Sequence, residues 1–137
     1  LDEMGRRAHM YRKIGEEFIA DDFAHEQSVV FETGKGLVIF NSCSHGGIVN
    51  IVREVQMALG GQKVYAVVGG FHMMKLSGMD TLAIPEEEVV ETAQELKGLG
   101  VEKIYTGHCT GNIAFRILKK ELGEMVHALG TGETVIF

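Results

Sequence analysis

The stretch GLVIFNSCSHGGIVN, residues 36–50, decides the fold of this chain. It begins with a continuous apolar run at residues 37–40, which predicts a strand buried on both faces. Small residues around His45 follow, and apolar residues then recur at helical spacing over residues 48–59. The stretch therefore predicts a strand, a turn that carries a histidine, and a helix.

The same pattern occurs twice more along the chain. Residues 64–68 predict a strand that leads into a glycine turn with His72, and residues 101–105 predict one that leads into a turn with His108 and a helix to about residue 122. Pro85, followed by three glutamates, is typical of a helix start. Alternating strands and helices predict an α/β fold with a parallel or mixed sheet and helices packed on it.

The flanking segments give weaker patterns. Residues 28–32 and 36–41 predict a hairpin joined by the glycine-containing turn at residues 33–36. Phe18 and Ile19 suggest a short strand, residues 1–17 an irregular lead-in or a short helix, and residues 135–137 a last edge strand.

Composition limits the class of protein. The chain has 137 residues, of which 45% are hydrophobic and 23% charged, and this predicts one folded domain over residues 1–137. A net charge of −6, with basic residues clustered only at Arg6, Arg7, Arg12 and Lys13, argues against a nucleic-acid partner.

Location and processing are also constrained. No apolar run is long enough for a membrane helix and no secretory signal opens the chain, so we expect a cytoplasmic protein without a membrane partner. Two cysteines are too few for a disulfide scaffold, which favours free thiols. The first residue is Leu1 rather than Met, as in a fragment, a processed product or a trimmed expression form.

His45, His72 and His108 each follow a predicted strand. Ligands of open α/β sheets bind at the carboxyl ends of the strands, where these histidines are expected to meet. Imidazole is a preferred ligand of zinc and related ions, and a metal-bound water can act as a nucleophile. Each histidine alone would more simply be a hydrogen-bonded turn residue, but three on one rim favour a metal site.

Other polar residues lie beside this rim. Cys43 and Cys109 could be ligands or a thiol nucleophile, although packing next to the site is the commoner role. Asp22 and Glu26 belong to an acidic turn, from which one carboxylate could orient a ligand histidine. The glycine-rich turns also allow a phosphate cradle, but none has a complete phosphate-binding motif.

Four segments in order, residues 22–27, 36–50, 69–72 and 107–111, resemble one branch of the metallo-β-lactamase superfamily. This branch comprises metal-dependent hydrolases related to the dihydropterin ribofuranosyl-aminobenzene phosphate synthase. The resemblance spans nearly all of residues 21–137, and it implies the carboxyl-terminal half of the family's αββα sandwich, a mixed sheet with helices packed on one face.

The resemblance also implies a site. His45 matches the third metal motif of the superfamily and His108 the fifth, while His72 stands where the fourth motif usually has an aspartate. Asn50 lies in the matching segment and is expected in the pocket. The implied cofactor is a divalent metal, with zinc expected and iron or manganese as alternatives, and the implied partner is a small-molecule substrate.

The superfamily's His-x-His-x-Asp-His motif is absent from this chain. We therefore expect an incomplete metal site in the isolated chain, and an apolar sheet face that pairs with a second copy or with a separate first-half chain. The leading hypothesis is a metal-dependent hydrolase of a phosphoester, ester or pterin-linked substrate. The alternatives are a non-catalytic metal-binding or assembly module of the same fold, and a metal-free thiol enzyme that uses Cys43 or Cys109.

Overall fold

The computed structural model describes residues 10–137, and its centre is a sheet with strand order β3-β4-β5-β6-β7. The antiparallel pair β3–β4 is followed by parallel pairs only. The strands are β3 (Ser28–Thr33), β4 (Gly36–Asn41), β5 (Val64–Gly69), β6 (Lys103–Thr106) and β7 (Val126–Ala128). The helices are α2 (Ile48–Ala58), α3 (Glu86–Gly98) and α4 (Asn112–Leu122). The predicted α/β fold with a mixed sheet is confirmed.

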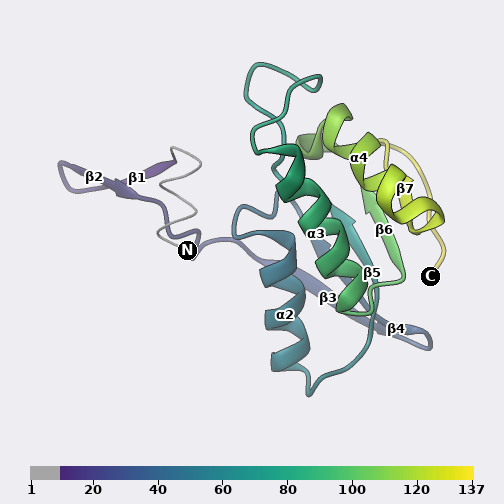
Figure 1. Cartoon of the computed structure of the whole chain (residues 1–137). Helices are drawn as coiled ribbons and strands as arrows, with labels where there is room; N and C mark the ends of the chain where they lie inside the picture. Colours follow the sequence, from purple (N-terminus) through teal and green to yellow (C-terminus); the bar gives the residue numbers. More distant parts are fainter. Residues whose placement is uncertain (1–9) are drawn as a thin grey trace.

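The three helices cover one face of this sheet (Figure 1). Leu37 and Ile39 of β4 point to the helices and are fully buried in the main core. Val38 and Phe40 alternate with them and belong to a second cluster on the opposite face. The continuous apolar run of β4 therefore serves both faces, as its sequence predicts.

The face opposite the helices is apolar and only partly covered. Phe137 crosses it and packs edge-on against Phe40 and Tyr105, with ring centroids 6.0 and 5.6 Å apart. Towards the β3 edge, Val29 and Phe31 remain 55% and 56% exposed. We call this surface the open sheet face.

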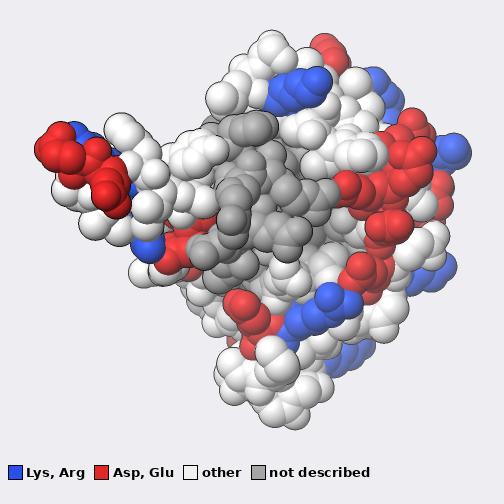
Figure 2. Space-filling view, turned by 60° about the vertical axis from the view of Figure 1, so that its left-hand side comes forward, with Lys and Arg blue, Asp and Glu red and all other residues white. Residues whose placement is uncertain are grey.

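The amino-terminal prediction is wrong over part of its length. Instead of an irregular lead-in or short helix, residues 11–20 form a hairpin of β1 (Tyr11–Ile14) and β2 (Glu17–Ala20), which turns at Gly15. The hairpin projects from the body of the molecule (Figures 1 and 2). Strand β2 contains the predicted short strand at Phe18 and Ile19. The first nine residues of the predicted lead-in lie outside the described part of the chain.

The carboxyl-terminal strand is misplaced in the prediction. The last strand of the sheet is β7. Helix α4 is flanked by two short 3-10 helices, η1 (His108–Thr110) before it and η2 (Gly123–Met125) after it, and β7 follows η2 directly. Residues 135–137 form no strand. Val126 is completely buried in the main core, whereas the apolar side chain of Phe137 packs on the open sheet face instead of pairing at the edge.

Charged residues are mixed over the surface, and on the face drawn in Figure 2 the acidic side chains cover more area than the basic ones. Of the basic cluster near the amino terminus, Arg12 pairs with Asp22 at 2.7 Å and Lys13 lies near Glu16, while Arg6 and Arg7 lie outside the described residues. Within residues 10–137, no helix is long and apolar enough to cross a membrane.

Candidate metal centre

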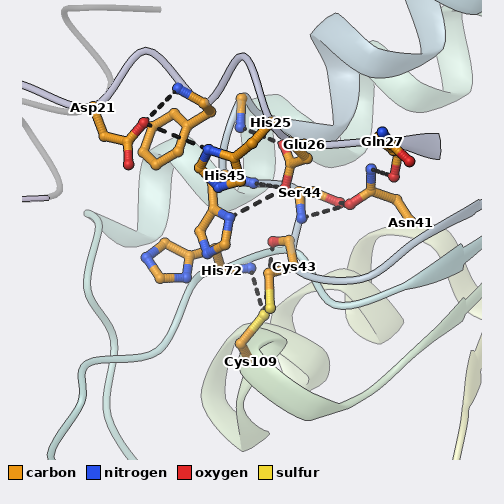
Figure 3. Close-up of polar contacts among 12 residues, drawn as sticks. Asp21, His25, Glu26, Gln27, Asn41, Cys43, Ser44, His45, His72 and Cys109 are labelled. Atoms are coloured by element: carbon orange, nitrogen blue, oxygen red, sulfur yellow. Dashed lines mark hydrogen bonds and ion pairs between the residues drawn. The ribbon is translucent and has the colours of Figure 1, made fainter. Parts of the chain in front are cut away.

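The turns after β4, β5 and β6 carry His45, His72 and His108, so all three histidines lie at the carboxyl end of the parallel strands. The rings of His45 and His72 meet edge to face, with centroids 4.6 Å apart (Figure 3). Burial lowers the pKa of His72, and the nearby His45 and His108 lower it further while Glu26 opposes them. We call this edge of the sheet the rim.

Glu26 holds the turn that carries His45. Its two carboxylate oxygens accept hydrogen bonds from the backbone N–H groups of His45, at 2.8 Å, and Gly46, at 2.9 Å. One of them also lies 3.2 Å from His45 Nδ1. A proton on Nδ1 satisfies this contact and leaves Nε2 with a free lone pair, which is the arrangement of a carboxylate-oriented metal ligand.

Phe23 completes the support of His45. Its ring is buried and stacks on the imidazole, with centroids 5.2 Å apart and an interplanar angle of 16°. The sequence analysis did not identify Phe23. It lies within the acidic turn and three residues before Glu26, and only the folded structure shows that it contacts His45.

Asn41 shapes the same turn from the end of β4. Its side-chain oxygen accepts hydrogen bonds from the backbone N–H of Ser44, at 2.7 Å, and from the Ser44 hydroxyl, at 3.2 Å. Its amide nitrogen donates to Ser28 Oγ at 2.8 Å, which ties the start of β3 to the rim. The sequence analysis missed this role, although an Asn that ends a strand is a known turn former.

A second network positions the turn after β5. Thr110 accepts a hydrogen bond from the backbone N–H of Phe71 at 2.9 Å, and its hydroxyl lies 2.5 Å from that of Thr106. Thr106 in turn donates to the carbonyl of Gly69 at 2.7 Å. Both threonines are completely buried, so this network fixes β5 against β6 directly below His72.

The rim backbone is strained at the residues that carry the polar groups. Ser44, His72 and His108 have φ angles of 53°, 50° and 49°, in the left-handed region that residues other than glycine seldom adopt. Such strain persists only where surrounding contacts enforce it, and it is common at functional sites.

Cys43 and Cys109 are free thiols that meet at the rim (Figure 3). Cys43 Sγ lies 3.4 Å from His108 Nε2, and the ligand atoms of Cys43, His108 and Cys109 all lie within 4.8 Å of one another. Burial raises the pKa of the Cys109 thiol to about 12. A thiol with so high a pKa is a poor nucleophile at neutral pH, which weakens the hypothesis of a thiol enzyme that uses Cys109.

The two remaining predicted site residues have different positions. Asn50 donates to the carbonyl of Gly46 at 2.9 Å and lines a hollow beside α2 together with Glu26 and Phe23. Asp22 instead pairs with Arg12 of the projecting hairpin and accepts a hydrogen bond from the backbone N–H of Ala24. Asp22 thus holds the base of the β1–β2 hairpin, whereas Glu26 contacts His45 at the rim.

Comparison with solved structures identifies the class of protein. A crystal structure described as a metal-dependent hydrolase of the β-lactamase superfamily matches with a TM-score of 0.81 and 30% sequence identity, over 93% of this chain and 46% of that one. The chain therefore has the fold of part of a metallo-β-lactamase superfamily protein and is similar to it in sequence, as the motifs predict.

A particular relative lies in the same branch. The chain is 37% identical over 128 residues to the 7,8-dihydropterin-6-methyl-4-(β-D-ribofuranosyl)-aminobenzene-5'-phosphate synthase of Methanocaldococcus jannaschii. The match covers 93% of this chain and 41% of the relative. The chain thus spans less than half the length of each of these two proteins. No family model matches it.

Proposed function

We propose that the rim is a metal site that supports hydrolysis of a small-molecule substrate, with His45, His72 and His108 as ligands. The observation that carries this proposal is the support of His45. Glu26 and Phe23 hold its imidazole with Nδ1 on the carboxylate, which leaves Nε2 available, and the ring meets that of His72 edge to face. The solved relative described as metal-dependent supports a divalent metal here.

The donor set fits the proposed metal. Imidazole nitrogens and thiols suit zinc, with iron or manganese as alternatives, and the lowered pKa of His72 favours the neutral, ligating form of that ring. When bound, the metal supplies Lewis acidity and an activated water. The chain's own part is to orient His45 through Glu26 and to shield that contact with the Phe23 ring.

The name of the similar synthase supports a class of substrate. The name of the similar synthase contains a dihydropterin and a 5'-phosphate, which supports a phosphorylated or pterin-linked small molecule as the substrate of this chain. That relative is named as a synthase and not as a hydrolase. The proposal of hydrolysis therefore rests on the solved structure described as a metal-dependent hydrolase.

Metal content per chain tests the proposal. Although the site is expected to be incomplete in the isolated chain, we expect elemental analysis of protein purified without chelator to detect bound metal, which His45→Ala and His108→Ala should lose. Glu26→Gln should weaken metal affinity by about 10–100-fold, because only the orientation of His45 is disturbed. The control is His25→Ala, which removes a nearby imidazole with 69% of its side chain exposed. Absence of metal from the unaltered protein would refute the site.

The open sheet face supports a second part of the proposal. Similarity to the superfamily implies a sandwich of two sheets, and Val29 and Phe31 leave an apolar area of this face in solvent. We propose that a second sheet covers it, supplied by a second copy of the chain or by a separate chain equivalent to the rest of its relatives. Size-exclusion chromatography with light scattering tests this, and a stable monomer at micromolar concentration would contradict pairing with a second copy.

Two further expectations remain part of the proposal. Residues 1–137 are expected to act as one domain, and the two free thiols favour a cytoplasmic location. Limited proteolysis that yields one protected core would support the first.

A further inference from the structure

We propose that Cys43, His108 and Cys109 form a second ligand set at the rim, which binds a thiophilic divalent cation such as Zn²⁺ through two thiolates and one imidazole. This inference deepens the proposed metal site, with which it shares His108. It goes beyond that site because the two cysteines become ligands rather than packing residues.

Distances within the trio favour coordination. With Zn–S bonds of about 2.3 Å and Zn–N bonds of about 2.0–2.1 Å, tetrahedral ligand atoms lie roughly 3.5–3.8 Å apart. Cys43 Sγ and His108 Nε2 are 3.4 Å apart, and no pair of ligand atoms in the trio exceeds 4.8 Å. Small side-chain rotations therefore close the set around an ion without any backbone rearrangement.

The surroundings of Cys109 are suited to a metal thiolate. The backbone N–H of His72 points at Cys109 Sγ from 3.3 Å, a contact that stabilises negative charge on sulfur. His72 makes this contact with a left-handed φ of 50°. Gly70 makes room for the sulfur, since a Cβ there would lie 2.6 Å from Cys109 Sγ.

Exposure within the trio leaves access for a further ligand. Cys109 is buried, Cys43 is half-buried and His108 is exposed. Three protein ligands with one side open to solvent are typical of a catalytic rather than a purely structural zinc site. The fourth position would be available to water or to an oxygen of the substrate.

His108 links the two ligand sets. Its Nε2 faces Cys43, whereas His45 and His72 face each other on the neighbouring part of the rim. Among residues 10–137, the trio is the group of Cys, His, Asp or Glu whose ligand atoms all come within 4.8 Å, and neither His45 nor His72 belongs to it. Ion binding at the trio is therefore separable from binding by His45.

Cobalt spectroscopy on the reduced, unaltered chain tests the inference. Thiolate-bound Co²⁺ gives an intense near-ultraviolet charge-transfer band, which imidazole and carboxylate ligands do not produce. We expect this band to saturate at one Co²⁺ per chain and to disappear when Zn²⁺ is added in competition. Reaction of the two thiols with a disulfide reagent should slow at least tenfold when Zn²⁺ is bound.

Variants separate the two ligand sets. The band should fall by about half in Cys43→Ser, vanish in Cys43→Ser/Cys109→Ser, and persist in His45→Ala, with folding of each variant checked by circular dichroism. Cobalt bound without a charge-transfer band would overturn this inference and leave the histidine site standing. No cobalt bound would overturn both. A band lost equally in His45→Ala would show that the thiols do not form a separate set.

Discussion

The glycines that end helices and the glycines of the rim are needed for different reasons. At the amino end, Gly60, Gly61 and Gly100 follow α2 and α3 with φ of 69°, 78° and 80°, and a Cβ added at any of them would meet nothing within 4 Å. These glycines end helices, where a left-handed residue is needed. At the rim, a Cβ on Gly69 would lie 1.8 Å from the carbonyl oxygen of Asn41.

The difference separates a local requirement from a tertiary one. Gly60, Gly61 and Gly100 are required only by their own backbone conformation, whereas Gly36 at the start of β4 is crowded, since a Cβ there would lie 2.7 Å from the carbonyl oxygen of Lys63. The rim glycines let neighbouring turns approach each other, and so they hold the polar side chains of the site in place. Substitutions of helix-ending and rim glycines should therefore differ in cost, and the following experiments test that difference.

The largest effect is expected from Gly69→Ala. The new Cβ clashes with a backbone oxygen that cannot move without breaking the β4–β5 contact, and the φ of 147° is unfavourable for alanine. We expect a loss of roughly 3–5 kcal/mol in the free energy of unfolding, or failure to fold. Gly60→Ala is the matched control, with a cost of about 1–2 kcal/mol from left-handed strain alone. Equal urea midpoints for the two variants would abolish the distinction.

A smaller effect is expected from Thr110→Val. This substitution leaves the buried N–H of Phe71 without its acceptor and removes the bond to Thr106, at a cost of about 1–3 kcal/mol. Thr33→Val at the hairpin turn removes the bond to the Gly36 carbonyl and the bond accepted from the backbone N–H of Lys35, both close to solvent, and should cost about 0.5–1.5 kcal/mol. Denaturant unfolding of both variants measures the free energy of unfolding, and we expect Thr33→Val to be more stable than Thr110→Val.

The smallest effect concerns pH. Burial lowers the folded-state pKa of His72 below its unfolded value of 6.5, so the unfolded chain binds more protons between these two values. The contribution of neutral His72 to the free energy of unfolding is complete above about pH 7, and it is lost as the pH falls through 6.5 towards the folded-state pKa. Metal-free protein should thus lose stability as the pH falls below about 7, and His72→Asn, which tolerates the left-handed φ, should lose less. An identical pH dependence for both would exclude this role of His72.

The sequence predicts the elements that carry a clear period, and it misses those defined by distant contacts. Strands β4, β5 and β6 are apolar runs and α2 has helical spacing, so their positions and the shared rim follow from local patterns. Strand β7 has only three residues and is specified by the burial of Val126, which no window of sequence shows.

The same limit applies within the site. The three histidines stand out because each follows a strand beside glycines, and Glu26 could be suggested as a partner from its charge. Phe23, Asn41 and Thr110 could not, because their contacts with His45, Ser44 and Phe71 depend on how separate turns meet. Apart from the short strand at Phe18 and Ile19, the hairpin at residues 11–20 was not predicted, because its exposed apolar residues form no pattern of burial.

The contacts of the rim also bear on the order of folding. Cys43 meets His108 across 65 positions of sequence, and Cys109 meets the carbonyl of Cys43 across 66. Closing such long loops costs entropy before any contact forms, so contacts of this kind slow folding and tend to form late. Substitutions at the rim should then accelerate unfolding while leaving the refolding rate nearly unchanged. The site would be the last part of the molecule to assemble and the first to open.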